Sequence, residues 1–207
     1  MSRNTFTTTS KWNQLLVGAL AISSLAALCI GLMPSAAADE SDKKTIVTFN
    51  APVEVPGKAL PAGTYVFKLL DSTGNRNIVQ IYDKDEKKLL ATILAIPDYR
   101  LMPSDKPVIT FEERPSGTPE AIKAWFYPGD TYGQQLVYPH KRAAELAKRT
   151  NQNVLSMRDD MTKNMTTSST SASDPNIKAM QNTEVTGVNP SGDPVALVII
   201  VATKPQQ

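Results

Sequence analysis

Side chains suited to catalysis are scarce in this chain of 207 residues. His140 is its only histidine and Cys29 its only cysteine. A catalytic triad or base that depends on histidine is therefore possible only at His140. One histidine and one cysteine do not supply the ligands of an ordinary zinc site, and the sequence has no glycine motif of the kind that cradles phosphates. We predict no catalytic residue, no metal site and no cofactor.

Carboxylates are the remaining candidates for chemistry. Glu112 and Glu113 are adjacent, but neighbours on a strand point to opposite faces. A glycosidase needs two carboxylates at a set separation across the bond that it breaks, so this pair alone does not serve. Asp98 and Asp130 would meet only if the fold brought them together. A carboxylate-dependent hydrolase acting on polysaccharide therefore remains an alternative function.

The densest group of side chains suited to recognition is the run WFYPGDTYGQQLVYP, residues 125–139. Alternation along a strand puts Phe126 on the apolar, buried face and Trp125 and Tyr127 on the opposite one, and Tyr132 follows a Pro-Gly-Asp turn. Trp125, Tyr127 and Tyr132 are therefore the candidate ligand-binding residues. As an aromatic platform they would stack on a sugar ring or a protein side chain. The alternative is that the helix predicted to follow covers them as ordinary core.

The first 38 residues have the order of a secretory signal peptide. A basic start precedes the apolar stretch 15–33, and small residues then lead to Ala38, followed by Asp39. We expect cleavage between Ala38 and Asp39 and export to the periplasm, the cell surface or the exterior. A retained membrane anchor is the alternative, because the stretch approaches the ~20 residues of a spanning helix. Lipidation of Cys29 is disfavoured because a leucine, not a small residue, precedes it.

Export would leave a chain without net charge. Loss of Arg3 and Lys11 lowers the number of Lys and Arg from 22 to 20, which equals the 20 Asp and Glu. A neutral chain gives no electrostatic reason to bind nucleic acid. Because Cys29 is lost as well, stability must come from an apolar core and not from disulfides. The mature form is predicted not to span a membrane.

The aromatic residues mark a domain boundary. In the expected mature chain, every Phe, Tyr and Trp lies between Phe49 and Tyr138. In residues 151–190, by contrast, 22 of 40 side chains are Ser, Thr, Asn, Gln or Asp. Such a composition does not bury enough apolar area to offset its ordering entropy. We predict one β-rich domain at 44–150, a disordered linker at 151–190 and a tail at 191–207.

Within 44–150 the hydrophobic pattern has a period of two. The predicted strands are TIVTFN, TYVFKLL, IVQIYD, LLATILAI, VITFEE and AIKAWFY. Turn sequences such as LPAGT and KDEKK separate them. LLATILAI (89–96) is apolar on both faces and is placed centrally in the sheet. Short strands without intervening helices predict a mainly β fold, a single antiparallel β-sandwich or barrel-like domain.

Two further elements are predicted beyond these strands. Residues 140–150, HKRAAELAKRT, consist of good helix formers and follow a proline, so one short helix is expected there. VALVIIVA at 195–202 is rich in β-branched residues and favours a strand, which would return to an edge of the domain or pair with EVTGV. KTIVTF (44–49) and KPVITF (106–111) share a pattern that two amphipathic strands produce by chance, and we infer no repeat.

Three stretches of the chain resemble a family of exported bacterial proteins of unknown function. They are VTFNAPVEVPGKALPAGTYVFKL, AIPDYR and AWFYPGDTYGQQLVYPHKRAAELAK, and they cover about residues 45–149. The shared features are a LPAGTY turn and strand and a WFYPG…YG…VYP segment. The resemblance implies a β-rich domain in the envelope or outside the cell, and it implies no catalytic residue.

The leading functional hypothesis is an exported, non-enzymatic β-domain of the bacterial envelope. It would bind a partner protein, a glycan or another envelope component, with the polar tail as a tether. One alternative is the carboxylate-dependent hydrolase, acting on envelope polysaccharide. Another is a structural or assembly role in which residues 195–202 are donated as a strand to a partner sheet. The sequence names neither a ligand nor an oligomeric state.

Overall fold

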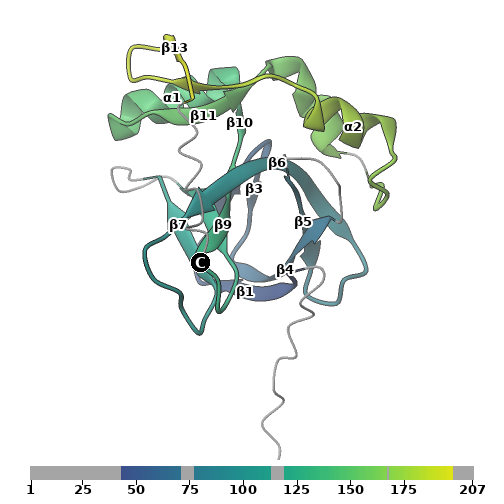
Figure 1. Ribbon diagram of the computed structural model, residues 1–207. Coiled ribbons are helices and arrows are strands. Elements are labelled where there is room, and N and C mark those ends of the chain that lie inside the picture. The colour runs from purple at the N-terminus through teal and green to yellow at the C-terminus, as the bar shows by residue number, and fades with distance from the viewer. Residues whose placement is uncertain (1–42, 71–76, 113–118, 167, 198–207) are drawn as a thin grey trace, which may run out of the picture. The chain divides into compact units, whose positions relative to one another are not determined.

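The computed structural model describes residues 43–70, 77–112, 119–166 and 168–197 (Figure 1). These residues all belong to one compact unit. The fold is mainly β, as predicted, and in the described residues its strands form a nine-stranded and a four-stranded sheet. The predicted signal peptide, with its cleavage position between Ala38 and Asp39, lies outside the described residues.

The strands of the larger sheet come first in the chain. They are β1 (Thr45–Phe49), β2 (Val53–Val55), β3 (Lys58–Leu60), β4 (Gly63–Leu70), β5 (Asn77–Asp83), β6 (Leu89–Tyr99), β7 (Val108–Phe111), β8 (Glu120–Phe126) and β9 (Tyr132–Leu136). The remaining elements form a C-terminal layer. They are β10 (Tyr138–Pro139), α1 (His140–Thr150), β11 (Val154–Met157), the 3₁₀ helix η1 (Asp159–Thr166), α2 (Pro175–Gln181), β12 (Val185–Val188) and β13 (Pro194–Val195).

Local sequence patterns account for the strands of the larger sheet. In β1 the residues alternate between buried and exposed, so that Val47 and Phe49 face the core while Ile46 and Thr48 face outward. The polar KDEKK segment joins β5 to β6 as a hairpin. Strand β6 lies between β5 and β9, which confirms the central position predicted from its apolar residues on both faces.

The order of the strands leaves the larger sheet open. It runs β1, β4, β5, β6, β9, β8. Strands β7 and β2 both pair with the far edge of β8, and β3 pairs with β2. Strands β1 and β2 thus lie at opposite ends of the sheet, although only Asn50–Pro52 separate them in the chain. The sheet must curl to bring its two ends together. Its concave side holds a cluster of aromatic rings, Phe49, Tyr65, Phe67, Phe111 and Trp125.

The helix predicted at 140–150 is confirmed. Helix α1 covers the predicted residues, with Pro139 as its N-cap and a left-handed Asn151 at its C-terminal end. Its hydrophobic side, Leu146 with two alanines, is fully buried. The helix contacts β10, β11 and β12 of the C-terminal layer.

The prediction of a disordered linker at 151–190 is wrong. This segment contains β11, η1, α2 and β12 (Figure 1). Its buried side chains are aliphatic residues and methionines spread along the segment: Val154, Leu155, Met157, Met165, Ile177, Met180, Val185 and Val188. A boundary at residue 150 therefore separates parts that share one core.

Contacts with the larger sheet explain why so polar a segment is ordered. Gln80 of β5 donates a hydrogen bond from Nε2 to the carbonyl oxygen of Ser169 at 2.8 Å. Asp174 caps α2 by accepting hydrogen bonds from two backbone N–H groups of its first turn. The apolar surface that offsets the ordering entropy is thus supplied partly by the sheet, which the composition of the segment does not reveal.

Of the strand predicted at 195–202, only Val195 lies in a strand, the two-residue β13, and Ala196 and Leu197 lie outside it. Strand β13 pairs antiparallel with β12, with Gly187 opposite Val195, across the turn Asn189–Asp193. This is the predicted pairing with EVTGV. Residues 198–202 lie outside the described residues.

Candidate functional site

The predicted aromatic platform does not form at Trp125. Its side chain is 1% exposed, and its ring centroid lies 5.9 Å from that of Phe67 of β4. The core alternative therefore holds for this residue, although the ring that packs on it belongs to the opposite wall of the sheet and not to α1. Tyr127 and Tyr132 are half-buried. Tyr132 packs edge-on against the exposed Tyr99 at 5.6 Å.

The three predicted residues do line one cavity, but it is very small. Its volume is about 10 Å³, at the lower limit of what holds a single water molecule. Within the described residues, Trp125 Nε1 and Gln134 Oε1 are buried at this cavity without a hydrogen-bond partner. Lys43 closes its rim by pairing with Asp130 at 2.8 Å, with its ammonium 4.8 Å from the centre of the Tyr127 ring. A sugar ring does not fit here.

Part of the WFYPG…YG segment has a structural explanation. Phe126 of β8 lies directly opposite Gly133 of β9. A Cβ atom at Gly133 would lie 2.4 Å from the Phe126 ring, which only glycine allows. Gly129 adopts a positive φ of 81° in the turn between the two strands. Both glycines therefore serve the hairpin rather than a ligand.

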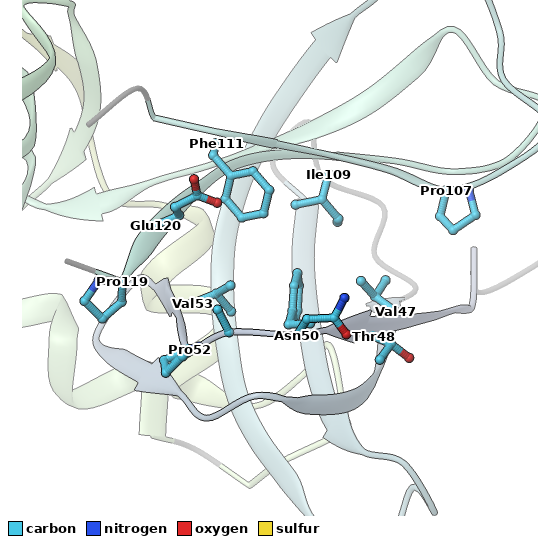
Figure 2. A pocket seen from close by; sticks show the side chains of 12 residues that line it. Val47, Thr48, Asn50, Pro52, Val53, Pro107, Ile109, Phe111, Pro119 and Glu120 are labelled. Carbon is cyan, nitrogen blue, oxygen red and sulfur yellow. The ribbon is translucent and has the colours of Figure 1, made fainter. Parts of the chain in front are cut away.

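A much larger concave site lies between the two ends of the sheet (Figure 2). We call it the β1–β7 groove, and its volume is about 820 Å³. Its walls are strands β1 and β7, and its lining is mostly apolar: Val47, Thr48, Phe49, Asn50, Ala51, Pro52, Val53, Pro107, Ile109, Phe111, Pro119 and Glu120. None of the three predicted binding residues lines it.

In the part of the chain that the structure describes, the walls of the groove are two strand edges without a neighbouring strand. Within the described residues, β1 pairs with β4 alone and β7 with β8 alone. Every step from β1 through β4, β5, β6, β9 and β8 to β7 is antiparallel. Because this path contains seven strands in the described part of the chain, β1 and β7 run in the same direction. One strand running opposite to both would pair antiparallel with each.

The spacing of the walls suits one additional strand. Four residue steps separate Phe49 from Val53, which limits the distance between their Cα atoms to about 14 Å. Two strand spacings amount to roughly 9.5 Å. At the floor of the groove, Phe49 and Phe111 meet edge-on with ring centroids 6.5 Å apart. The described strands β1 and β7 do not pair with each other, and side chains already close the floor of the groove between them.

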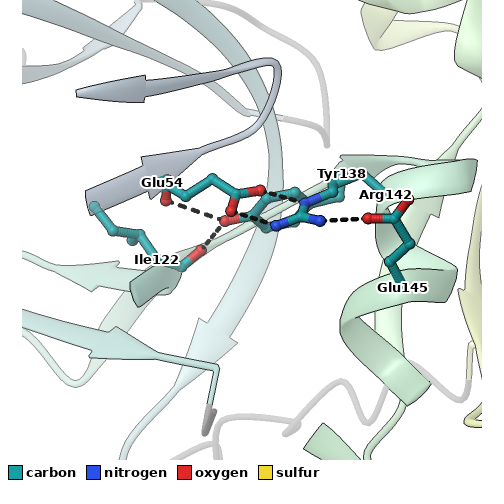
Figure 3. Close-up of polar contacts among 5 residues, drawn as sticks. All are labelled: Glu54, Ile122, Tyr138, Arg142 and Glu145. Atoms are coloured by element: carbon teal, nitrogen blue, oxygen red, sulfur yellow. Dashed lines mark hydrogen bonds and ion pairs between the residues drawn. The ribbon is translucent and has the colours of Figure 1, made fainter. Parts of the chain in front are cut away.

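The crossing end of the groove, where Asn50–Pro52 pass from β1 to β2, is joined to α1 (Figure 3). Arg142 of α1 donates hydrogen bonds from Nε and Nη2 to the two carboxylate oxygens of Glu54, each at 2.6 Å. Arg142 also pairs with Glu145. The hydrogen bonds that Arg142 donates to Glu54 raise the pKa of Arg142 above its ordinary value. Tyr138 donates a hydrogen bond to the carbonyl oxygen of Ile122 at 2.8 Å, which ties β8 to the same junction.

The start of β1 is held by a carboxylate in the β5–β6 turn. Glu86 pairs with Lys44, which precedes β1, and with Lys68 of β4 at 2.5 Å. Hydrogen bonds from Lys44 and then Lys68 lower the pKa of Glu86. Glu86 thereby fixes the edge strand at the end of the groove far from the crossing.

Acidic residues do not converge in the groove. Glu120 is the one carboxylate among its lining residues. Asp130 pairs with Lys43, and Asp98 accepts a hydrogen bond from the backbone N–H of Tyr99. A search of the described residues found no group of three or more His, Cys, Asp and Glu side chains placed to hold a metal ion.

Comparison with protein-family models, curated proteins and solved structures found no match to this chain. None of the helices in the described part of the chain has the length and apolar character needed to cross a lipid bilayer.

Sequence reasoning missed the groove because its walls are set by strand order. The relevant signal was the similarity between KTIVTF and KPVITF, which proved to be β1 and β7 with the residues that precede them. Val47 and Phe49 take the same pattern positions as Ile109 and Phe111, and all four line the groove.

Proposed function

We propose that this protein is a non-enzymatic β-domain of the bacterial envelope that binds an extended segment of a partner protein in the β1–β7 groove. The observation that carries the proposal is that two strand edges, unpaired among the described residues, face each other across an apolar groove. An extended peptide would add hydrogen bonds to both edges, where most strand-adding domains offer only one. The order of basic, apolar and small residues before Asp39 supports export.

The chemistry of the groove also defines the bound segment. A strand between β1 and β7 would point alternate side chains toward the aromatic floor and toward solvent. Apolar β-branched residues alternating with polar ones fit these two environments. Glu120, at the crossing end, favours a cation near the N-terminus of the peptide, because a strand antiparallel to β1 enters at this end.

The other candidate functions find less support. A glycan would leave many hydroxyl groups against an apolar lining that offers them few partners. A hydrolase of the predicted type would need a second carboxylate beside Glu120. An assembly role, in which residues 195–202 are donated as a strand to a partner sheet, would also need an unpaired strand edge on that partner.

The experiment measures binding of a short peptide of alternating Val and Thr with a lysine at its N-terminus. Fluorescence anisotropy gives the affinity, and NMR chemical shifts locate the site. The measurement is made on the full chain and on its Ile200→Pro variant, because the apolar run 195–202 is a candidate competitor for the groove. We expect shifts concentrated on β1 and β7, and a clear loss of binding when the central valine of the peptide is replaced by proline.

Matched variants test the location. Ile109→Lys places an unpaired ammonium in the groove and is expected to weaken binding at least about tenfold, or ~1.4 kcal/mol. Ile46→Lys makes the same change on the outer face of β1, where Ile46 is 56% exposed, and should alter the affinity less than about twofold. Absence of binding in both the full chain and Ile200→Pro, or equal effects of the two lysines, would refute the proposal.

A further inference from the structure

We propose that one water molecule is bound between Trp125 of β8 and Gln134 of β9, behind the ion pair of Lys43 and Asp130. The water accepts a hydrogen bond from the indole N–H of Trp125 and donates one to the side-chain oxygen of Gln134. The site is the small cavity that the three predicted binding residues line. This inference is independent of the proposed function, because neither Trp125 nor Gln134 lines the β1–β7 groove.

Strand pairing places the two polar groups on one face of the sheet. Trp125 and Gln134 lie directly opposite each other in the antiparallel pair of β8 and β9. Side chains at directly opposite positions project to the same face, with Cβ atoms about 5 Å apart. Both residues line the small cavity, and they are only 1% and 3% exposed. An indole donor and an amide acceptor therefore border the same enclosed space.

Both groups need a hydrogen-bond partner that the described residues do not provide. Among these residues, Trp125 Nε1 and Gln134 Oε1 are buried without one. An unpaired buried donor or acceptor costs the full penalty of its removal from water. Buried polar groups in native proteins therefore nearly always pair with protein or with ordered water. A water molecule between the two groups satisfies both at once, and it accounts for a glutamine beside the aromatic rings of the concave side.

The size and the chemistry of the cavity select water over other small ligands. A volume of about 10 Å³ leaves room for one water molecule and nothing larger. The occupant must accept a hydrogen bond from Trp125 and donate one to Gln134. A metal cation or an ammonium ion has no lone pair for the indole N–H, and a chloride ion has no proton for the amide oxygen. Lys43 and Asp130, which also line the cavity, bring further polar groups to the water.

An ion pair closes the solvent side of this site. Lys43 Nζ lies 2.8 Å from Asp130 Oδ2, and the two side chains are 29% and 35% exposed. The same ammonium lies 4.8 Å from the centre of the Tyr127 ring, which also lines the cavity. The route from the buried groups to solvent therefore passes this ion pair. Exchange of the bound water requires Lys43 and Asp130 to separate.

Nuclear magnetic resonance of the indole N–H tests the water directly. The full chain is used with Trp12→Phe, which leaves Trp125 as its only tryptophan. A bound water should give a cross-peak with this N–H, and rotating-frame spectra distinguish the contact from proton exchange by sign. Gln134→Met removes the acceptor at similar volume and should abolish the cross-peak. Gln135→Met is the matched control, because Gln135 points to the opposite face of β9, and it should keep the cross-peak.

A crystal structure that shows ordered waters is the second measurement, and it needs no substitution at the site. We expect one water within about 3.2 Å of both Trp125 Nε1 and Gln134 Oε1. A dry cavity or a direct hydrogen bond between the two side chains would overturn the assignment. A cross-peak that survives in Gln134→Met would overturn it as well.

Hydrogen exchange tests the ion pair as the gate. Asp130→Asn removes one charge of the pair. It should speed exchange of the Trp125 indole N–H about fivefold relative to a core amide, the factor that a pair of this exposure can contribute. The backbone N–H of the fully buried Ile93 in β6 serves as the core amide. Asp160→Asn breaks the exposed pair with Arg158 and should leave the ratio unchanged. An equal ratio in the two variants would overturn the role of the ion pair.

Discussion

Replacing Arg142 with methionine tests whether the C-terminal layer stabilises the groove-bearing sheet. The change removes a guanidinium held by both carboxylate oxygens of Glu54 at 2.6 Å. The Arg142 side chain is 29% exposed and that of Glu54 only 14% exposed. Exposed ion pairs contribute up to ~1 kcal/mol, whereas breaking a fully buried pair costs ~3–5 kcal/mol. For this intermediate burial we expect a loss of about 2 kcal/mol.

The assay is urea unfolding followed by far-UV circular dichroism, with thermal unfolding alongside. A loss of this size lowers Tm by roughly 4–8 °C in a domain of this length. Arg158→Met is the matched control, because Arg158 and Asp160 form a pair whose side chains are 71% and 45% exposed. The control should lose less than about 0.5 kcal/mol. If the two variants lose equal stability, the bridge between Glu54 and α1 does not couple the layer to the sheet.

Two further predictions concern stability. Because the pKa of Glu86 in the folded protein is below its ordinary 4.5, this carboxylate stabilises the fold above that pH, and its contribution is lost as the pH falls through the folded pKa. Glu86→Gln should therefore reduce the fall in Tm between about pH 5 and pH 3, whereas Asp85→Asn at an exposed position should leave this fall unchanged. An equal pH dependence of Tm in the two variants would contradict this. Ile177→Ala should lower the free energy of unfolding by ~2–5 kcal/mol, since Ile177 is fully buried although its segment is polar. Lys178→Ala, on the exposed side of the same helix, should change it by less than ~0.5 kcal/mol, and equal small effects would restore the disordered-linker hypothesis.

Much of the larger sheet was predictable because alternation reports directly on burial. Val47 and Phe49 of β1 are buried while Thr48 between them is exposed, as the period of two requires. The doubly apolar β6 is central for the same reason. These are local relations between a residue and its two neighbours, so no knowledge of distant strands is needed.

The order of the C-terminal layer was not predictable from composition. Averaging over residues 151–190 hides well-spaced anchors such as Ile177 and Met180, both fully buried. Their helix, α2, contacts η1 and strand β5 of the larger sheet, so their burial depends on a surface that lies partly outside the segment. Composition estimates what a segment buries by itself, and here the segment is ordered by what it packs against.

The aromatic platform predicted at Trp125 does not form, for a related reason. Trp125 alternates correctly with Phe126, but alternation does not say which face of a curled sheet is sealed. Trp125 faces the concave side, where Phe67 packs on it. The groove, in turn, depends on β7 and β2 sharing one edge of β8, a long-range arrangement to which no single strand sequence points.

The same arrangement bears on how unpaired strand edges can be tolerated in a binding protein. A single free edge that accepts a strand presents a new free edge afterwards, so pairing can continue without limit. In the β1–β7 groove both walls belong to one sheet, and the short crossing at Asn50–Pro52 limits the gap to about one strand. One bound strand would use the inner edges of β1 and β7 together and leave no further edge between them. A site built in this way takes up one strand and then stops, which is the property that a binding function requires and that an open edge lacks.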